Sequence, residues 1–316
     1  MEVFNADKNS WLRSCQNVKF ENNVLEAELK DTGGNWKYNR IYIHNLLLNK
    51  NLSNDNGIFR YNLTKDEDDE IMKQLFPIYE GETIDHIDIY KCVMLSIDLP
   101  KYNKTREETL QILLNHYILP PLRVHYGYTK ETASSCKFYE YMQNKNNRNE
   151  FTLGMLEIFE NFANEDENEN RWMLYLEDDV RVINLKEGDN LSILYNVPVD
   201  AELIRLYNGK NEPCDITNVK YKISHGGGYC HAFYIKVSAC KKVIHYAKKY
   251  KWKFICDIDI FKLAKHCGNF PTGYDGWTLS ATDNVNDITD KLQEDEKINM
   301  YHLTHCIFNQ TSLPCV

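Results

Sequence analysis

Hydrophobic and polar positions divide the chain into a short stretch of alternating segments and a longer stretch in which strands alternate with helices. Residues 1–62 contain brief apolar runs separated by turn residues, a pattern that predicts a small all-β unit. Residues 63–89 carry the acidic run 66–70 and no sustained periodicity, so we expect a linker and the domain boundary there, with the acidic run as a solvated helix start or a linker face. Residues 90–316 follow as a second and larger domain.

The N-terminal stretch contains three turn signals between its strand-like segments. The segments 18–20 and 24–27 alternate in polarity and flank a predicted hairpin turn at 21–23. Asp-Thr-Gly-Gly-Asn at 31–35 and Asn-Asp-Asn-Gly at 54–57 predict two further turns, because glycine and asparagine tolerate the backbone conformations that tight turns require.

The larger stretch has the pattern of an α/β domain. Segment 92–97 is almost continuously apolar, as expected of a strand buried on both faces, and 172–176 is a second such strand. Helical spacing over 105–117 and 151–162 brackets a strand-like segment at 123–126. This alternation predicts a mostly parallel sheet with helices on both faces.

Three adjacent carboxylates, Glu177, Asp178 and Asp179, end the strand predicted at 172–176. Ligands of open α/β sheets bind at the carboxyl ends of strands. Adjacent acids are costly to remove from water unless a cation neutralises them, and carboxylate oxygens suit Mg²⁺ or Mn²⁺, which also bind phosphate. A solvated acidic exit from the strand is the alternative, and the motif alone does not decide between the two.

The residues around this motif resemble glycosyltransferases of family 25, which include lipooligosaccharide glycosyltransferases and collagen galactosyltransferases. An apolar strand running into Glu-Asp-Asp matches 174–182, and blocks resembling 203–209, 227–235 and 257–261 follow in the family's order. The resemblance covers about residues 90–312. It implies a Rossmann-like GT-A fold, a nucleotide-sugar donor (a UDP-sugar by preference), a glycan or glycoprotein acceptor, and a divalent metal, Mn²⁺ or Mg²⁺.

Metal and donor ligands follow from the same resemblance. Asp179 is the expected main metal ligand, and Asp178 either shares the ion or contacts the ribose of the donor. A late histidine returning to the metal is expected at His305, with His302 as its close competitor. Glu177 is assigned to donor binding.

The acceptor hydroxyl must lose a proton, which in an inverting enzyme requires a base. Asp259 is the candidate, with Asp257 as substitute; the alternative is a strand whose acids face solvent. Gly227 and Gly228 can bring backbone N–H groups close to a diphosphate, and a plain turn is the competing interpretation.

Residues 11–62 resemble one repeat of the cyanovirin-N homology lectins, on the turn residues 33–36 and 54–61. Glu28 stands at the family's second cysteine position, so Cys15 has no local disulfide partner. The resemblance implies weak glycan binding, and a structural appendage is the alternative. A single repeat this small is marginal by itself, so we expect it to pack on the catalytic domain or to form a homodimer with a second chain.

Composition removes several classes of protein. The net charge of −9 disfavours a nucleic-acid partner, and no run approaches 18 apolar residues, so we expect no membrane span. Ten scattered cysteines without an N-terminal apolar run favour free thiols in a cytoplasm, including that of a host cell if the Asn-, Lys- and Ile-rich composition reflects a large virus. The alternatives to a transferase are a carbohydrate-binding protein with a degenerate transferase domain and a metal-dependent phosphohydrolase or nucleotidyltransferase.

Overall fold

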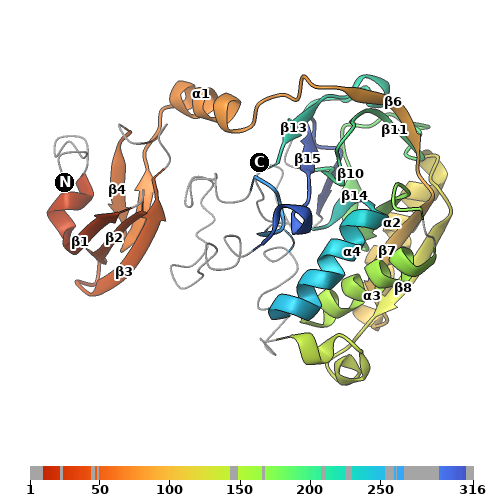
Figure 1. Cartoon of the computed structure of the whole chain (residues 1–316), viewed down its shortest axis with the longest axis horizontal. Coiled ribbons are helices and arrows are strands. Elements are labelled where there is room, and N and C mark those ends of the chain that lie inside the picture. The colour runs from red at the N-terminus through yellow and green to blue at the C-terminus, as the bar shows by residue number, and fades with distance from the viewer. Residues whose placement is uncertain are drawn as a thin grey trace. The chain divides into compact units, whose positions relative to one another are not determined.

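The computed structural model describes residues 10–21, 24–43, 47, 50–142, 149–165, 168–207, 211–224, 230–252, 260, 262–266 and 292–310. They divide into two compact units, one containing the described residues up to Pro77 together with His266, and one containing those of 78–265 and 292–310. The boundary falls inside the segment 63–89, where the sequence places it, and this segment contains a helix and a strand. Helix α1 (Lys65–Leu75) belongs to the first unit and strand β6 (Thr83–Asp88) to the second (Figure 1).

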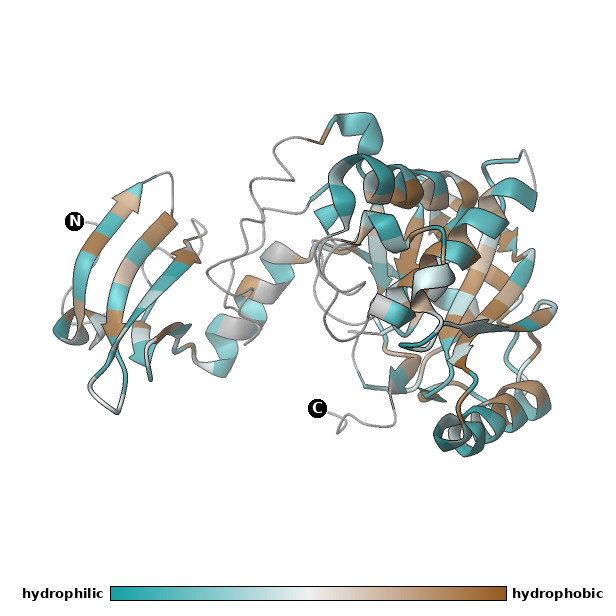
Figure 2. Cartoon of the chain, turned by 90° about the horizontal axis from the view of Figure 1, so that it is seen from below, coloured by the Kyte–Doolittle hydropathy of each residue, from teal (hydrophilic) through white to brown (hydrophobic). Residues whose placement is uncertain are grey.

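The first unit is built around a three-stranded antiparallel sheet, as the alternating pattern predicts. Its elements are η1 (Ser10–Ser14), β1 (Cys15–Glu21), β2 (Val24–Lys30), β3 (Trp36–Tyr42) and the hairpin β4 (Leu52–Asp55) and β5 (Ile58–Tyr61). Every second residue of β2 is buried, namely Leu25, Ala27 and Leu29. Figure 2 shows this alternation as hydrophobic and hydrophilic bands along the strands. The buried side packs on Trp11 and Phe59, whose rings meet edge to face at 5.2 Å.

Two of the three predicted turns of this unit, at 31–35 and 54–57, are confirmed, and the third, at 21–23, includes residues outside the described ones. Asn56 and Gly57 connect β4 to β5 with φ values of 52° and 87°, the backbone of a two-residue type I′ hairpin loop. In the turn at 31–35, the carboxylate of Asp31 accepts a hydrogen bond from the backbone N–H of Asn35 at 2.8 Å. Asn56 joins the two turns, because its side-chain oxygen accepts from the backbone N–H of Thr32 at 2.9 Å.

The second unit is a mixed α/β domain around a seven-stranded sheet of order β13-β15-β12-β14-β9-β7-β8. Five of the seven strands are parallel to one another, while β13 and β14 run the opposite way. The strands are β7 (Lys91–Ile97), β8 (Leu122–Gly127), β9 (Trp172–Glu177), β12 (Leu203–Arg205), β13 (Tyr221–Ile223), β14 (Ala232–Lys236) and β15 (Met300–Leu303). Two smaller ladders pair β6 with β11 (Ile193–Pro198) and β10 (Val180–Val182) with β16 (Phe308–Gln310).

Helices cover both faces of this sheet, as predicted. The helices are α2 (Pro100–His116), α3 (Asn149–Glu165) and α4 (Val237–Tyr246), and α3 packs against α4. Consecutive strand residues point to opposite faces. Ser96 of β7 bonds to Arg106 of α2, whereas its neighbour Leu95 lies against Gly154 of α3, so close that a Cβ on Gly154 would stand 2.8 Å from Leu95 Cδ1. Helices α2 and α3 therefore lie on opposite faces.

Helix α2 begins five residues earlier than the predicted start at 105. Pro100 occupies its first turn, where the missing N–H of proline costs no hydrogen bond. The acidic pair Glu107 and Glu108 consequently lies beyond the first turn of the helix.

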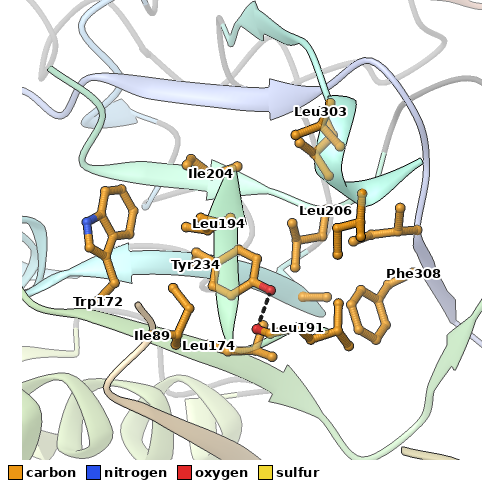
Figure 3. Packing of buried hydrophobic residues seen from close by; sticks show 14 of the residues in the cluster. Ile89, Trp172, Leu174, Leu191, Leu194, Ile204, Leu206, Tyr234, Leu303 and Phe308 are labelled. Carbon is orange, nitrogen blue, oxygen red and sulfur yellow. Dashed lines mark hydrogen bonds between the residues drawn. The ribbon is translucent and has the colours of Figure 1, made fainter. Parts of the chain in front are cut away.

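The hydrophobic core shown in Figure 3 lies between the seven-stranded sheet and segments of the chain that connect its strands. Trp172 and Leu174 of β9 pack with Ile204 of β12 and the ring of Tyr234 on β14. The buried hydroxyl of Tyr234 donates to the carbonyl of Leu191 at 2.9 Å, so the polar atom is satisfied inside an apolar cluster.

The composition predicts free cysteine thiols and no membrane span. Seven cysteines lie in the described ranges and all are free thiols, five of them buried. No helix in the described part of the chain is both long and apolar enough to span a bilayer.

Candidate functional site

The acidic motif lies at the sheet edge where the parallel strands end, as the sequence predicts. Leu95 of β7 pairs with Glu177, the last residue of β9. On the other side of β9, the backbone N–H of Glu177 donates to the carbonyl of His231 at 2.8 Å, immediately before β14 begins. The carboxyl ends of β7, β9, β12 and β15 therefore meet at one edge, together with the start of β14.

Asp178 is fixed on the α2 face of this edge. Ser96 Oγ donates to its Oδ2 at 2.5 Å, and Arg106 Nη1 donates to the same serine oxygen at 3.0 Å. The hydroxyl of Thr109 donates to the backbone carbonyl of Asp178 at 2.9 Å. Burial raises the pKa of Asp178, and the hydrogen bond from Ser96 and the charge of Arg106 oppose that rise. One carboxylate oxygen of Asp178 is thus already occupied by the protein.

Asp179 has a different environment, although it is the next residue. It lies in the turn between β9 and β10, and its Oδ1 is buried with no hydrogen-bond partner among the described residues. Burial, with a smaller contribution from the neighbouring carboxylate of Asp178, raises the pKa of Asp179 to about 6. The ionised form of this carboxyl is therefore unfavourable unless a positive charge comes to it.

This pair of carboxylates fits a hard divalent cation. A buried oxygen without a partner, next to a second carboxylate at a ligand-binding sheet edge, is the donor set that Mg²⁺ or Mn²⁺ uses. Within the described ranges, however, no three His, Cys, Asp or Glu side chains gather into a group that can hold a metal ion. The predicted combination of Asp178, Asp179 and His305 is therefore not assembled as a three-ligand site. A cation bound to one or two carboxylates ordinarily completes its shell with phosphate oxygens and water.

The segment that carries His305 does return toward the acidic motif. Val180, which follows the motif, pairs with Gln310, and the backbone N–H of Ile183 donates to the carbonyl of Ile307 at 3.0 Å. His305 itself makes a 3.1 Å hydrogen bond between its Nδ1 and the hydroxyl of Thr304. Its competitor His302 is buried inside β15, paired in register with Arg205.

A buried polar cluster occupies the other face of the same edge. Glu177 pairs with Leu95 and so faces α3, opposite to Asp178, as strand alternation predicts. Nearby, Arg205 Nε donates to the hydroxyl of Tyr207 at 3.0 Å, and the rings of Tyr207 and His231 are 4.2 Å apart. Burial, with a smaller contribution from the charge of Arg205, lowers the pKa of His231 to about 3, so the imidazole is neutral at physiological pH.

Ser96, Arg106 and Thr109 were missed by sequence reasoning. Ser96 left a visible signal, because it is the one hydroxyl in the apolar run 92–97, which ends at this edge of the sheet. Arg106 and Thr109 left none, since their role depends on which face of α2 packs against β7 and the turn after β9.

Four predicted residues lie outside the described residues. They are the candidate bases Asp257 and Asp259 and the candidate diphosphate-binding glycines Gly227 and Gly228. Their assignments stay predictions.

Comparison of the chain with protein-family models and with curated proteins found no match. The site is therefore interpreted from its own geometry.

Proposed function

We propose that the second unit is a metal-dependent glycosyltransferase that moves a sugar from a nucleotide-sugar donor to a hydroxyl of a glycan or glycoprotein. The observation that carries the proposal is the buried carboxylate oxygen of Asp179, which has no hydrogen-bond partner in the described chain and stands next to Asp178 at the carboxyl edge of the sheet. A divalent cation brought with a sugar-nucleoside diphosphate satisfies that oxygen and neutralises both acids.

Asp178 and Asp179 have separate tasks in this proposal. Asp179 supplies the main contact to Mn²⁺ or Mg²⁺, whose chemistry is to stabilise the negative charge that develops on the departing diphosphate. Asp178, held at Oδ2 by Ser96, contributes its remaining oxygen in a fixed orientation, either to the ion or to the donor. Proton removal from the acceptor is assigned to Asp259, with Asp257 as substitute.

The sheet supports assignment to a GT-A-type Rossmann-like fold. Its parallel strands carry helices on both faces, and one antiparallel strand, β14, is inserted next to the strand that ends in the acidic motif. In open sheets of this class, the ligand site lies at the carboxyl ends of the strands.

The test is turnover of a panel of nucleotide sugars with and without Mn²⁺, comparing the wild-type chain with Asp179→Asn. Asp85→Asn on exposed β6 serves as the control. In wild type and the control we expect Mn²⁺-dependent transfer of the sugar to an acceptor, or slow hydrolysis of the nucleotide sugar when no acceptor is present. In Asp179→Asn we expect this turnover to fall by at least about 100-fold. Release of phosphate without sugar transfer would favour the phosphohydrolase, and turnover unaffected by Asp179→Asn would overturn the proposal.

A second candidate, carbohydrate binding without turnover, is favoured by one feature of the first unit. Trp36 and Tyr38 on β3 share one face of the sheet and are 44% and 55% exposed, an arrangement that suits stacking on sugar rings. If this is the main function, glycan binding by the full chain is lost in Trp36→Ala and retained in Asp179→Asn, and no nucleotide sugar is turned over.

A further inference from the structure

One half-exposed aromatic side chain lies on the same face of the sheet as the serine that holds Asp178. Tyr126 is the penultimate residue of β8 and is 50% exposed. It pairs in register with Ser96, so both side chains project from the same face of the sheet. Ser96 is the residue that holds Asp178. The Tyr126 ring and Asp178 therefore lie on the same face of the sheet at this edge.

Arg106 covers one face of the ring, and half of the Tyr126 side chain remains exposed. The guanidinium carbon of Arg106 lies 5.1 Å from the ring centroid, and Arg106 is itself held by Ser96 at 3.0 Å and by the side-chain oxygen of Asn103 at 2.8 Å. This buried guanidinium, held by two hydrogen bonds, fixes the ring and presents a positive charge on one side of it. A second cation on the opposite face would be repelled, whereas a neutral planar ring stacks there without that cost.

We propose that Tyr126 is the platform on which the base of a nucleoside diphosphate stacks, with Arg106 as the positioning residue behind it. This inference rests on the proposed function. Strand β7 alone separates β8 from β9, so the platform and the acidic motif are about 10 Å apart across two strand spacings. That separation is what a ribose and a diphosphate bridge when the base stacks at one end and a cation at Asp179 holds the phosphates at the other.

The experiment measures binding of UDP, CDP, ADP and GDP, and separately of inorganic pyrophosphate, to the full chain with Mn²⁺ by calorimetry. The variants are Tyr126→Ala, Tyr126→Phe and Asp179→Asn. Tyr90→Ala is a matched control, because Tyr90 is 44% exposed and also carries a guanidinium over its ring, that of Arg171 at 4.3 Å, but it precedes β7 at the opposite edge of the sheet.

We expect Tyr126→Ala to weaken binding of the preferred nucleoside diphosphate about 10-fold or more, the usual effect of removing an aromatic ring from under a base. Tyr126→Phe keeps the ring and stays within about 3-fold, and Tyr90→Ala does not change the affinity. Pyrophosphate has no base, so its binding is unchanged in Tyr126→Ala and is lost in Asp179→Asn.

The possible failures are distinguishable. If Asp179→Asn abolishes nucleotide binding while Tyr126→Ala leaves it intact, the platform is wrong and the proposed function stands. If Tyr126→Ala weakens pyrophosphate and nucleotide equally, the ring serves the structure of the site and does not contact a base, which also overturns the inference. If no diphosphate binds the wild-type chain with Mn²⁺, the proposed function fails and the platform fails with it.

Discussion

Replacing Asp179 with asparagine is expected to stabilise the protein at neutral pH when no metal is present. The pKa of Asp179 is raised from 3.8 to about 6, roughly two units, and each unit corresponds to about 1.4 kcal/mol. The ionised carboxylate therefore costs the folded state about 3 kcal/mol. Because the folded pKa is the higher one, stability from this group is fully present below about pH 4 and is lost as the pH rises through 6. Asparagine has the same shape and carries no charge.

The assay is thermal and denaturant unfolding of the full chain in EDTA between pH 4 and pH 8. At pH 7.5 we expect Asp179→Asn to unfold about 5–10 °C above wild type, with the difference shrinking toward zero at pH 4. Saturating Mn²⁺ should reverse the order, since the cation stabilises the native wild type and has lost its main ligand in the variant. The exposed control Asp85→Asn should follow wild type throughout. A stability difference that is absent at pH 7.5, or that is equally large at pH 4, would refute the reasoning.

Two further substitutions test packing and hydrogen bonding, one within each unit. Gly154→Ala places a methyl group 2.8 Å from Leu95 Cδ1. We therefore expect denaturant unfolding to show a free energy of unfolding lower by about 1–2 kcal/mol, despite the better helix propensity of alanine. A stabilised variant would contradict the close helix–strand contact. Asn54→Ala removes three hydrogen bonds: to Ser14 Oγ at 2.8 Å, to the carbonyl of Lys30 at 2.8 Å and from the N–H of Gly57 at 2.7 Å. We expect the free energy of unfolding of the first unit to fall by about 2–3 kcal/mol. A fall below about 0.5 kcal/mol would show that water replaces these bonds.

The strands that sequence predicts best are those buried on both faces. The apolar runs at 92–97 and 172–176 became β7 and β9, because a continuous hydrophobic segment of this length is compatible with few positions other than the centre of a covered sheet. Strand β6 was missed for the opposite reason. It is exposed along nearly its whole length, so its pairing with β11 leaves no hydrophobic period in the sequence.

The start of α2 illustrates a second limit. Its N-cap is Leu99, whose side chain makes no capping hydrogen bond, so the usual serine, threonine or aspartate signal is missing. Pro100 at the first turn was the remaining cue, and a proline also marks loops. Without a capping side chain at its start, the helix was predicted to begin five residues too far along the chain.

The candidate site divides along the same line. The acidic motif was predictable because three adjacent carboxylates at the end of a buried strand are chemically unusual wherever they occur. The difference between Asp178 and Asp179 was not, because it depends on Ser96 and Arg106, which reach the motif only when β7, α2 and the turn after β9 have packed. Sequence can thus indicate where charge gathers, while the assignment of tasks to individual acids requires the fold.

The contrast between the two aspartates argues against a merely solvated strand exit. Acids that end a strand in water keep an ordinary pKa and exchange hydrogen bonds with solvent. Here Asp178 is bonded to Ser96, and Asp179 keeps a buried oxygen without a partner in the described chain and a pKa raised to about 6. A purely structural site would be more stable with a neutral residue at 179, because burying an unpaired charge is costly. The proposed cation would offset that cost, which makes the effect of Mn²⁺ on the stability of wild type and Asp179→Asn the decisive measurement.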